Sequence, residues 1–282
     1  EVIKIEDPRG GDYCRALSPE LFSLANRGKK SVTLDLKNKE HVVAFHELVK
    51  TADIVIESFR PGVMDKLGCG YATLREINPK IVYAALTGYG HTGPYRDRPG
   101  HDINYRAYAG ELEALAQSGG EIEMDGVPVA DLAGGALTCA VGVLAALHGA
   151  RTSGRGAFVD VAMLEGALAL QIQKVATMRA QLSGQKDAAL TGVQPNYGMY
   201  RCADGKFVAI GAVEEKFFDR FCRLVGREDL LKLSTAPGAA GAPLKQALGE
   251  LFMTKSRDDW EALLAADDTC VTAVLGLEEA MR

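Results

Sequence analysis

The sequence lacks most of the patterns that identify a chemistry at once. Its six cysteines lie far apart, without the paired spacing of zinc sites or disulfide frameworks, so we expect reduced thiols and no metal. The glycines form no GxGxxG fingerprint after the first strand, no P-loop and no Gly-x-Ser-x-Gly elbow. These absences argue against a dinucleotide-dependent enzyme, an NTPase and an α/β-hydrolase. Basic residues are not in excess, because 32 Lys and Arg stand against 37 Asp and Glu, so we expect no nucleic-acid partner.

Long apolar runs are also lacking. The longest, around residues 136–147, is shorter than a bilayer requires and is followed by Arg151 and Arg155, so we expect no membrane span. No signal peptide heads the chain, and we expect a cytoplasmic protein. The chain starts in a strand pattern without an initiator Met, which predicts that it begins inside a fold. A peroxisomal or mitochondrial address would then be invisible if the source is eukaryotic.

What the sequence does contain is a soluble composition and a strand–helix alternation. The 282 residues, 47% of them hydrophobic, suffice for one large domain or two. Apolar strand patterns alternate with helix patterns at 2–6, 31–34, 39–49, 53–57, 71–77, 81–86, 131–149, 157–161 and 164–182. This alternation predicts parallel βαβ units and an α/β fold with a Rossmann-like, doubly wound parallel sheet.

A change of character follows. Strand patterns at 199–202 and 206–211 flank an Asp-Gly turn, and helix patterns follow at 215–224, 243–253 and 257–265. We therefore predict a large domain over 1–185, a linker over 186–198 and a smaller α+β domain over 199–282.

The glycine-rich loop at 88–100 is the strongest candidate for a site, because it follows the carboxyl end of a predicted strand. It leads to His101 and Asp102 at the start of a helix. Histidine is suited to proton transfer near neutral pH. On spacing alone, an equally good interpretation is that Asp102 caps the helix and His101 is solvated.

Other candidates are weaker when taken alone. Asp131 opens a helix ahead of Gly134 and Gly135, which would let a ligand approach the backbone, but an N-capping Asp is a common feature. Glu214 begins another helix, where acidic residues favour the helix dipole. Basic residues near predicted strand ends, such as Arg60, are surface charges by default.

Taken together, several segments resemble the class III CoA-transferase superfamily. They are Ala25–Lys37, Ala52–Val63, Thr87–Gly90, Thr92–Pro94 and Gly154–Gly156. Within it, Gly100–Tyr105 resembles the α-methylacyl-CoA racemase branch, which places His before the Asp; Arg106 stands where transferases have a Gln. The resemblance implies a further strand and helix before residue 1, a tail after residue 282, and an interlocked homodimer.

The resemblance also implies roles for particular residues. His101 and Asp131 match the two acid/base residues, Glu214 the carboxylate that orients the His, and Asp102 the transferase nucleophile. The positions matching the CoA site are Leu34, Lys37, Phe59, Arg60, Lys66 and Tyr105. Near Asp7 a basic residue of the family is replaced, with Arg9 as a substitute.

The implied function is an acyl-CoA racemase or epimerase acting on 2-methyl-branched acyl chains, with no cofactor beyond the CoA of the substrate. Inverting a carbon α to a thioester needs two bases on opposite faces, which His101 and Asp131 would supply. Helix-start N–H groups near Gly134 and Gly135 would hold the enolate oxygen. Two alternatives stay open: a CoA-transferase that works through Asp102, and an inactive CoA-binding relative.

Overall fold

The structure, a computed structural model, describes residues 1–113, 126–184 and 193–282. It divides into two compact units, Glu1–Gln171 and Ile172–Arg282. The observed division therefore precedes the predicted one at residue 185, because helix α10 (Ile172–Leu182) is grouped with the second unit. Of the predicted linker at 186–198, residues 186–192 lie outside the described residues. Its last two residues already belong to strand β6 (Tyr197–Arg201).

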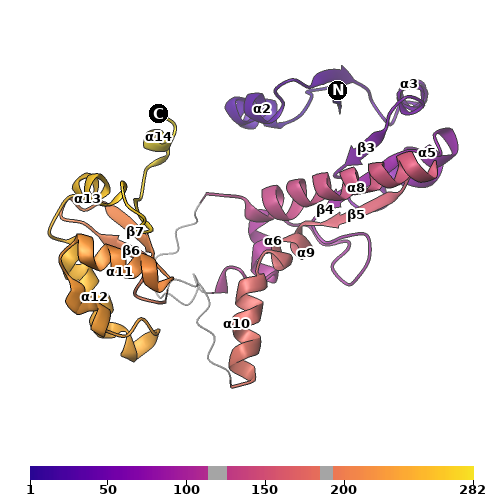
Figure 1. The fold of residues 1–282 in the computed structure, drawn as a ribbon. Helices are drawn as coiled ribbons and strands as arrows, with labels where there is room; N and C mark the ends of the chain where they lie inside the picture. The colour runs from indigo at the N-terminus through magenta and orange to yellow at the C-terminus, as the bar shows by residue number, and fades with distance from the viewer. Residues whose placement is uncertain (114–125, 185–192) are drawn as a thin grey trace. The chain divides into compact units, whose positions relative to one another are not determined.

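Three parallel strands form the centre of the first unit, in the order β3, β4, β5 (Figure 1). They are β3 (Ile54–Glu57), β4 (Val82–Thr87) and β5 (Phe158–Ala162). Strand β4 is the middle strand, and its side chains alternate between two cores. Val82 and Ala84 pack with residues of α8 on one face, and Tyr83 and Ala85 pack with residues of α3 and α5 on the other. Helices on both faces confirm the doubly wound α/β class.

The helices on the second face have the bounds that the sequence predicts, α3 at Lys39–Val49 and α5 at Tyr71–Ile77. Helix α3 begins where the Asn38 side chain accepts the N–H of Glu40, which satisfies a donor that has no partner within the helix. The buried residues Phe45 and Val49 face the sheet.

A two-stranded parallel sheet precedes this core and pairs β1 (Ile3–Glu6) with β2 (Lys30–Thr33). Two short helices that the sequence analysis missed lie between them, α1 (Cys14–Leu17) and α2 (Pro19–Ala25). Neither buries a residue, although Leu17, Leu21 and Leu24 recur at helical spacing and are exposed. The buried Glu6 carboxylate joins this region, because it accepts hydrogen bonds from Arg15, Ser31 and the N–H of Asp12.

One long helical run covers the first face of the sheet. It consists of the π-helix η1 (Ala130–Leu137) and the α-helix α8 (Thr138–Ser153). Over its 24 residues, Ala130–Ser153, this run is longer than the apolar stretch 136–147 and meets the length and composition of a membrane span. A single helix of this kind does not establish a span, because a core helix meets the same test. Its buried residues Cys139, Val143 and Ala150 pack on β4 and β5, which is how a helix covers a sheet.

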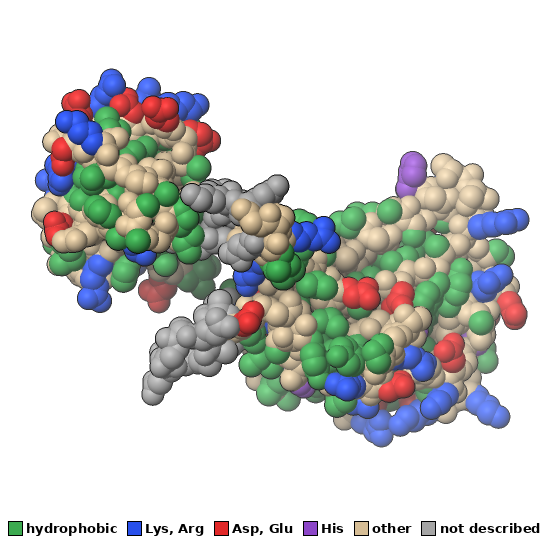
Figure 2. All heavy atoms as spheres, turned by 90° about the horizontal axis from the view of Figure 1, so that it is seen from below, with side chains coloured by type: hydrophobic (Ala, Val, Ile, Leu, Met, Phe, Trp, Pro, Cys, Tyr) green, Lys and Arg blue, Asp and Glu red, His purple; other side chains and the backbone are tan. Residues whose placement is uncertain are grey.

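The other side of this run is open to solvent. Leu137, Val141 and Leu144 lie one helical turn apart and are more than 60% exposed. Figure 2 shows hydrophobic side chains exposed between charged ones on one face of the first unit, and on that face basic and acidic side chains are interspersed.

After β5 the chain continues into α9 (Met163–Ala169), which ends before α10 begins. The sequence predicts one helix over 164–182, and this prediction is wrong. At the break the buried Gln171 donates its side-chain N–H to the carbonyl of Ala109, a contact 62 residues away that helix periodicity cannot show.

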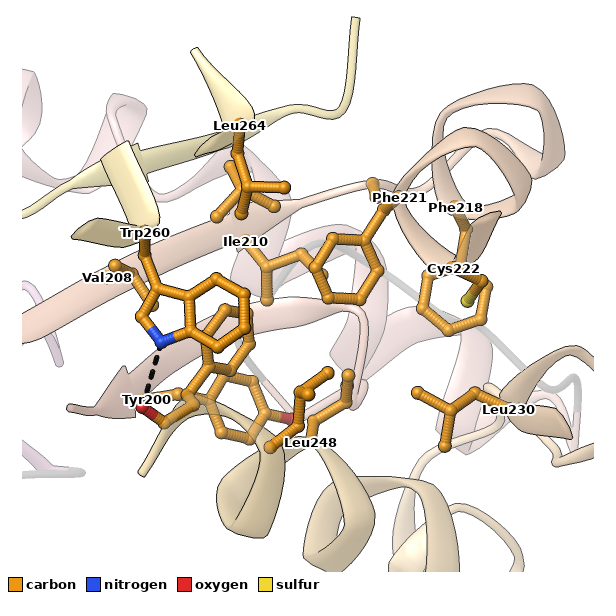
Figure 3. Packing of buried hydrophobic residues seen from close by; sticks show 14 of the residues in the cluster. Tyr200, Val208, Ile210, Phe218, Phe221, Cys222, Leu230, Leu248, Trp260 and Leu264 are labelled. Atoms are coloured by element: carbon orange, nitrogen blue, oxygen red, sulfur yellow. Dashed lines mark hydrogen bonds between the residues drawn. The ribbon is translucent and has the colours of Figure 1, made fainter. Parts of the chain in front are cut away.

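The second unit is built on a three-stranded antiparallel sheet in the order β6, β7, β8, with β7 at Phe207–Gly211 and β8 at Val271–Ala273. Strand β8 was not predicted. The other elements after α10 are α11 (Glu215–Leu224), η2 (Glu228–Lys232), η3 (Gly238–Ala240), α12 (Ala242–Phe252), α13 (Arg257–Leu264) and α14 (Leu277–Ala280). Trp260 is buried among the aromatic rings of this core and donates its indole N–H to the carbonyl of Phe252 at 2.9 Å (Figure 3).

Candidate functional site

The loop that follows β4 delivers His101 to the start of α6 (Asp102–Tyr108), as the sequence predicts. His101 has an extended backbone, its N–H donates to the Asn104 side chain at 3.0 Å, and its own side chain is exposed. The Tyr105 hydroxyl donates to the carbonyl of Gly100 at 2.6 Å and so closes the loop onto α6. A Cβ on Gly100 would lie 2.7 Å from the Tyr105 ring, so this close approach requires glycine.

Asp102 links α6 to the beginning of η1. Its carboxylate accepts the N–H of Ala130 at 2.7 Å and the N–H of Asp131 at 3.1 Å. On its other side, the Arg106 guanidinium lies 3.5 Å away and also binds Glu111 at 2.7 Å. Arg106 is itself buried. Asp102 is therefore held by two hydrogen bonds from the backbone and by an ion pair with Arg106.

Asp131 lies at the same helix start, where it interacts electrostatically with Asp102 and His101. Desolvation raises the pKa of the Asp131 carboxyl, the negative charge of Asp102 raises it further, and His101 opposes the shift. The side chain still reaches solvent. His101, Asp102 and Asp131 thus form one cluster, in which Asp131 retains its proton to a higher pH than an ordinary aspartate.

The start of η1 is fixed by contact with α9. A Cβ on Gly134 would lie 2.7 Å from the backbone nitrogen of Ala167, and one on Gly166 would lie 2.6 Å from the Cα of Gly134. The two backbones therefore touch. A Cβ on Gly135 would likewise lie 2.8 Å from the Met163 side chain. Gly134 and Gly135 are therefore required by helix packing on the side where a Cβ would lie. The expectation that a ligand approaches the backbone here stays a prediction.

The predicted CoA residues fall into two groups within the first unit. Phe59 and Arg60 are exposed in the loop after β3, and Lys66 ends the short helix α4 (Val63–Lys66). The positive charge of Arg60 acts on the nearby Tyr105, although burial raises the pKa of that phenol overall. This group therefore adjoins the His101 loop.

Leu34 and Lys37 form the second group, after β2. The N–H of Leu34 donates to the carbonyl of Glu6, and the exposed Lys37 lies in the turn that leads to α3. Arg9 binds Asp7 at 2.7 Å and, with a smaller effect of Lys37, lowers the pKa of Asp7 to about 2. The basic residues Arg9 and Lys37 thus gather after neighbouring strands.

Glu214 lies in the second unit, as the residue before α11, and its side chain is exposed. Its predicted pairing with His101 therefore stays a prediction. The residues that the structure describes contain no group of three or more His, Cys, Asp or Glu side chains arranged to hold a metal ion.

Two contacts near the candidate site escaped the sequence analysis. Arg106 was noted only as a departure from the transferases, and its hold on Asp102 was missed. An acidic residue four positions before an arginine on one helix is a recognisable signal for such a pair. The second is the buried Glu57, whose partners become evident only in the fold.

Comparison with known proteins agrees with this architecture. The sequence matches the description of CoA-transferase family III over residues 1–282. The chain belongs to CoA-transferase family III. Its fold is also that of solved structures: a hypothetical protein from Mycobacterium tuberculosis matches with a TM-score of 0.85 and 33% identity, over 100% of this chain and 78% of that one. A CaiB/BaiF family protein from Brucella suis matches with a TM-score of 0.81 and 29% identity, with the same two shares.

Relatives of family III with named activities fall on both sides of the racemase and transferase division. The α-methylacyl-CoA racemase of Mus musculus is 36% identical over 257 residues, which cover 90% of this chain and 68% of that protein. The succinate–glutarate CoA-transferase of Agrobacterium fabrum is 34% identical, over 80% of this chain and 60% of that protein. This family III chain is therefore an enzyme of the superfamily, and its resemblance to the racemase branch is supported by sequence identity.

Proposed function

We propose that the enzyme is an acyl-CoA racemase or epimerase that inverts the α carbon of 2-methyl-branched acyl-CoA thioesters. The observation that carries this proposal is the engagement of Asp102 by two backbone N–H groups and by Arg106. A carboxylate that accepts two backbone N–H bonds and lies beside a guanidinium has its negative charge stabilised, which lowers its nucleophilicity relative to a free carboxylate. His101 and Asp131 keep side chains that reach solvent.

In this mechanism one base removes the α proton from one face of the substrate, and the conjugate acid of the other returns a proton to the opposite face. For one direction neutral His101 is the base and protonated Asp131 is the acid. For the other direction, the Asp131 carboxylate is the base and protonated His101 is the acid. The raised pKa of Asp131 suits it to the acid role, since less free energy is then needed to keep its proton near neutral pH.

The substrate's CoA supplies binding energy and needs no additional cofactor. We assign it to Arg60, Lys37 and Lys66 as phosphate-binding cations, with Leu34, Phe59 and Tyr105 as apolar or aromatic contacts. The exposure of Phe59 and of the three cations supports this assignment. Glu214 would orient His101, as the family resemblance implies.

The alternative is a CoA-transferase in which Asp102 forms anhydride and thioester intermediates. The sequence identity to the succinate–glutarate CoA-transferase supports this alternative. Solvent deuterium exchange separates the two. Incubated in D2O with a 2-methylacyl-CoA and no acceptor acid, a racemase incorporates deuterium at the α carbon. CoA movement that depends on an added acid would refute the racemase proposal, and neither activity together with retained CoA binding would indicate an inactive relative.

Variants test the same point by residue. His101→Ala and Asp131→Ala should each slow exchange by about 10²–10⁴-fold, because either loss leaves one face without a proton donor or acceptor. Asp102→Asn should be milder. Asp97→Asn, an exposed carboxylate on the same loop, is the matched control and should leave the rate unchanged. If Asp102→Asn is dead and hydroxylamine traps an acyl-enzyme in the parent, the transferase alternative holds instead.

We also propose that the enzyme works as a homodimer. The support is the open apolar stripe of Leu137, Val141 and Leu144, because exposed stripes of this kind mark association surfaces. Sedimentation velocity at micromolar concentration should give a dimer. Val141→Lys should shift it towards monomer, whereas a single monomeric species in the parent would contradict the proposal.

A further inference from the structure

Glu57 is a buried carboxylate at the carboxyl end of β3. It is 8% exposed, and none of the ion pairs among the residues that the structure describes includes it. Its partners are the N–H of Phe59, which donates to the carboxylate at 2.7 Å, and the side chain of Tyr83. Buried carboxylates are normally paired with a cation, so this arrangement calls for an explanation.

The arrangement costs stability. Burial raises the pKa of Glu57, and the negative charge of Asp65 adds to the shift, while the hydrogen bond from the N–H of Phe59 and the neighbouring Tyr83 hydroxyl oppose it. A carboxyl whose pKa is raised by folding favours the folded state only below its unfolded pKa, and this contribution is lost as the pH rises through the folded value. Near neutral pH, ionised Glu57 therefore destabilises the unit relative to a neutral side chain.

The Glu57 carboxylate holds the backbone of the turn between β3 and α4. By holding the Phe59 N–H, it fixes the backbone from which Phe59, 47% exposed, and Arg60 project into solvent. The turn ends at Gly62, whose positive φ of 82° is accessible to glycine without strain. An exposed aromatic ring beside an exposed guanidinium suits a nucleotide, because the ring stacks on a base and the guanidinium binds phosphate.

We propose that Glu57 is a positioning residue for CoA, which presets the Phe59–Arg60 turn to receive the nucleotide part. This inference rests on the proposed function, since it takes the ligand to be CoA. It makes a prediction that a purely structural role does not: neutralising Glu57 should weaken CoA binding while leaving thermal stability unchanged or improved.

Calorimetric titration with CoA tests this on the whole chain. Glu57→Gln keeps the size of the side chain but offers a neutral acceptor, so the CoA dissociation constant should rise about fivefold. The melting temperature should not fall, and kcat for α-proton exchange at saturating substrate should stay within twofold while KM rises. Glu76→Gln, an exposed carboxylate on α5, is the matched control and should change none of these.

Tyr83→Phe provides a second variant, because it keeps the buried ring and removes only the hydroxyl that faces Glu57. It should weaken CoA binding in the same direction. If the parent binds CoA and both variants bind as the control does, or if kcat falls while the dissociation constant is unchanged, the positioning role is wrong and the proposed function stands. If the parent does not bind CoA, the proposed function itself fails.

Discussion

The contact between η1 and α9 gives the most direct test of how the fold holds the cluster of His101, Asp102 and Asp131, for which we propose the catalytic role. Gly166→Ala would place a methyl group 2.6 Å from the Cα of Gly134, and still closer to other backbone atoms of that residue. Backbone atoms cannot rotate away as a side chain can, so the two helices must separate. Asp131 lies three residues before Gly134, so the separation should displace it.

The magnitude follows from two opposing effects. Overpacking of this kind costs about 1–3 kcal/mol, and contact with backbone on both sides favours the upper part of that range. Alanine in a helix regains about 1 kcal/mol relative to glycine. The net loss should be about 1–2 kcal/mol, which lowers the melting temperature of a unit of this size by about 2–8 °C.

Gly149→Ala is the matched control. Gly149 is an exposed position in α8 with no atom within 4 Å of the added Cβ, so this change should stabilise by about 0.5–1 kcal/mol. Thermal unfolding followed by circular dichroism should therefore move in opposite directions for the two alanines. α-Proton exchange should fall at least tenfold in Gly166→Ala alone, because small displacements of a catalytic group are costly. A Gly166→Ala protein as stable and as active as the parent would refute this account of the helix contact.

Three further outcomes are expected. Glu6→Gln should lower the free energy of unfolding by about 1.5–3 kcal/mol at neutral pH, because Arg15 and other donors hold the pKa of the buried Glu6 carboxyl far below its usual range. In urea unfolding, the difference in stability between the variant and the parent should shrink as the pH falls below about 4, where the carboxyl of the unfolded chain is protonated. In the pH profile of the α-proton exchange rate, Asp102→Asn should move the acid limb to lower pH, because the charge of Asp102 raises the pKa of Asp131. An acid limb at the same pH as in the parent would show that Asp102 does not influence the group that titrates there. Arg60→Glu should raise the CoA dissociation constant at least tenfold, about 1.4 kcal/mol, and unchanged affinity would remove Arg60 from the site.

The parts of the fold that the sequence predicts are those with a strong local pattern. Helices α3 and α5 bury one apolar face and were predicted at their observed bounds. Helices α1 and α2 are only four and seven residues long, so the apolar repeat of Leu17, Leu21 and Leu24 is too short to stand out, and in the structure it is exposed. The break before α10 coincides with a hydrogen bond from Gln171 to Ala109, and such long-range contacts leave no trace in a local window.

The site divides in the same way. His101 and Asp131 could be named as candidates because each lies at a helix start and matches a family motif, and the structure brings them into one cluster. Their roles stay a prediction. The spacing of Asp102 and Arg106 on one helix could have indicated their pairing, but the other partners of Arg106, Glu111 and the carbonyl of Val127, come together only in the fold. In the sequence Glu57 is only the last residue of a strand pattern, because its burial and its hydrogen bond from the N–H of Phe59 are visible only in the structure.

Trp260 is the only tryptophan in the sequence, and it lies in the core of the second unit. Because its indole is 1% exposed and hydrogen-bonded to a backbone carbonyl, its emission should shift to longer wavelength when that core opens to water. The fluorescence of the native protein is therefore a reporter for one unit, whereas helical ellipticity comes from both. Superimposable denaturation curves from the two signals would mean that the units unfold as one cooperative system, and separated curves would give each unit its own stability without any labelling.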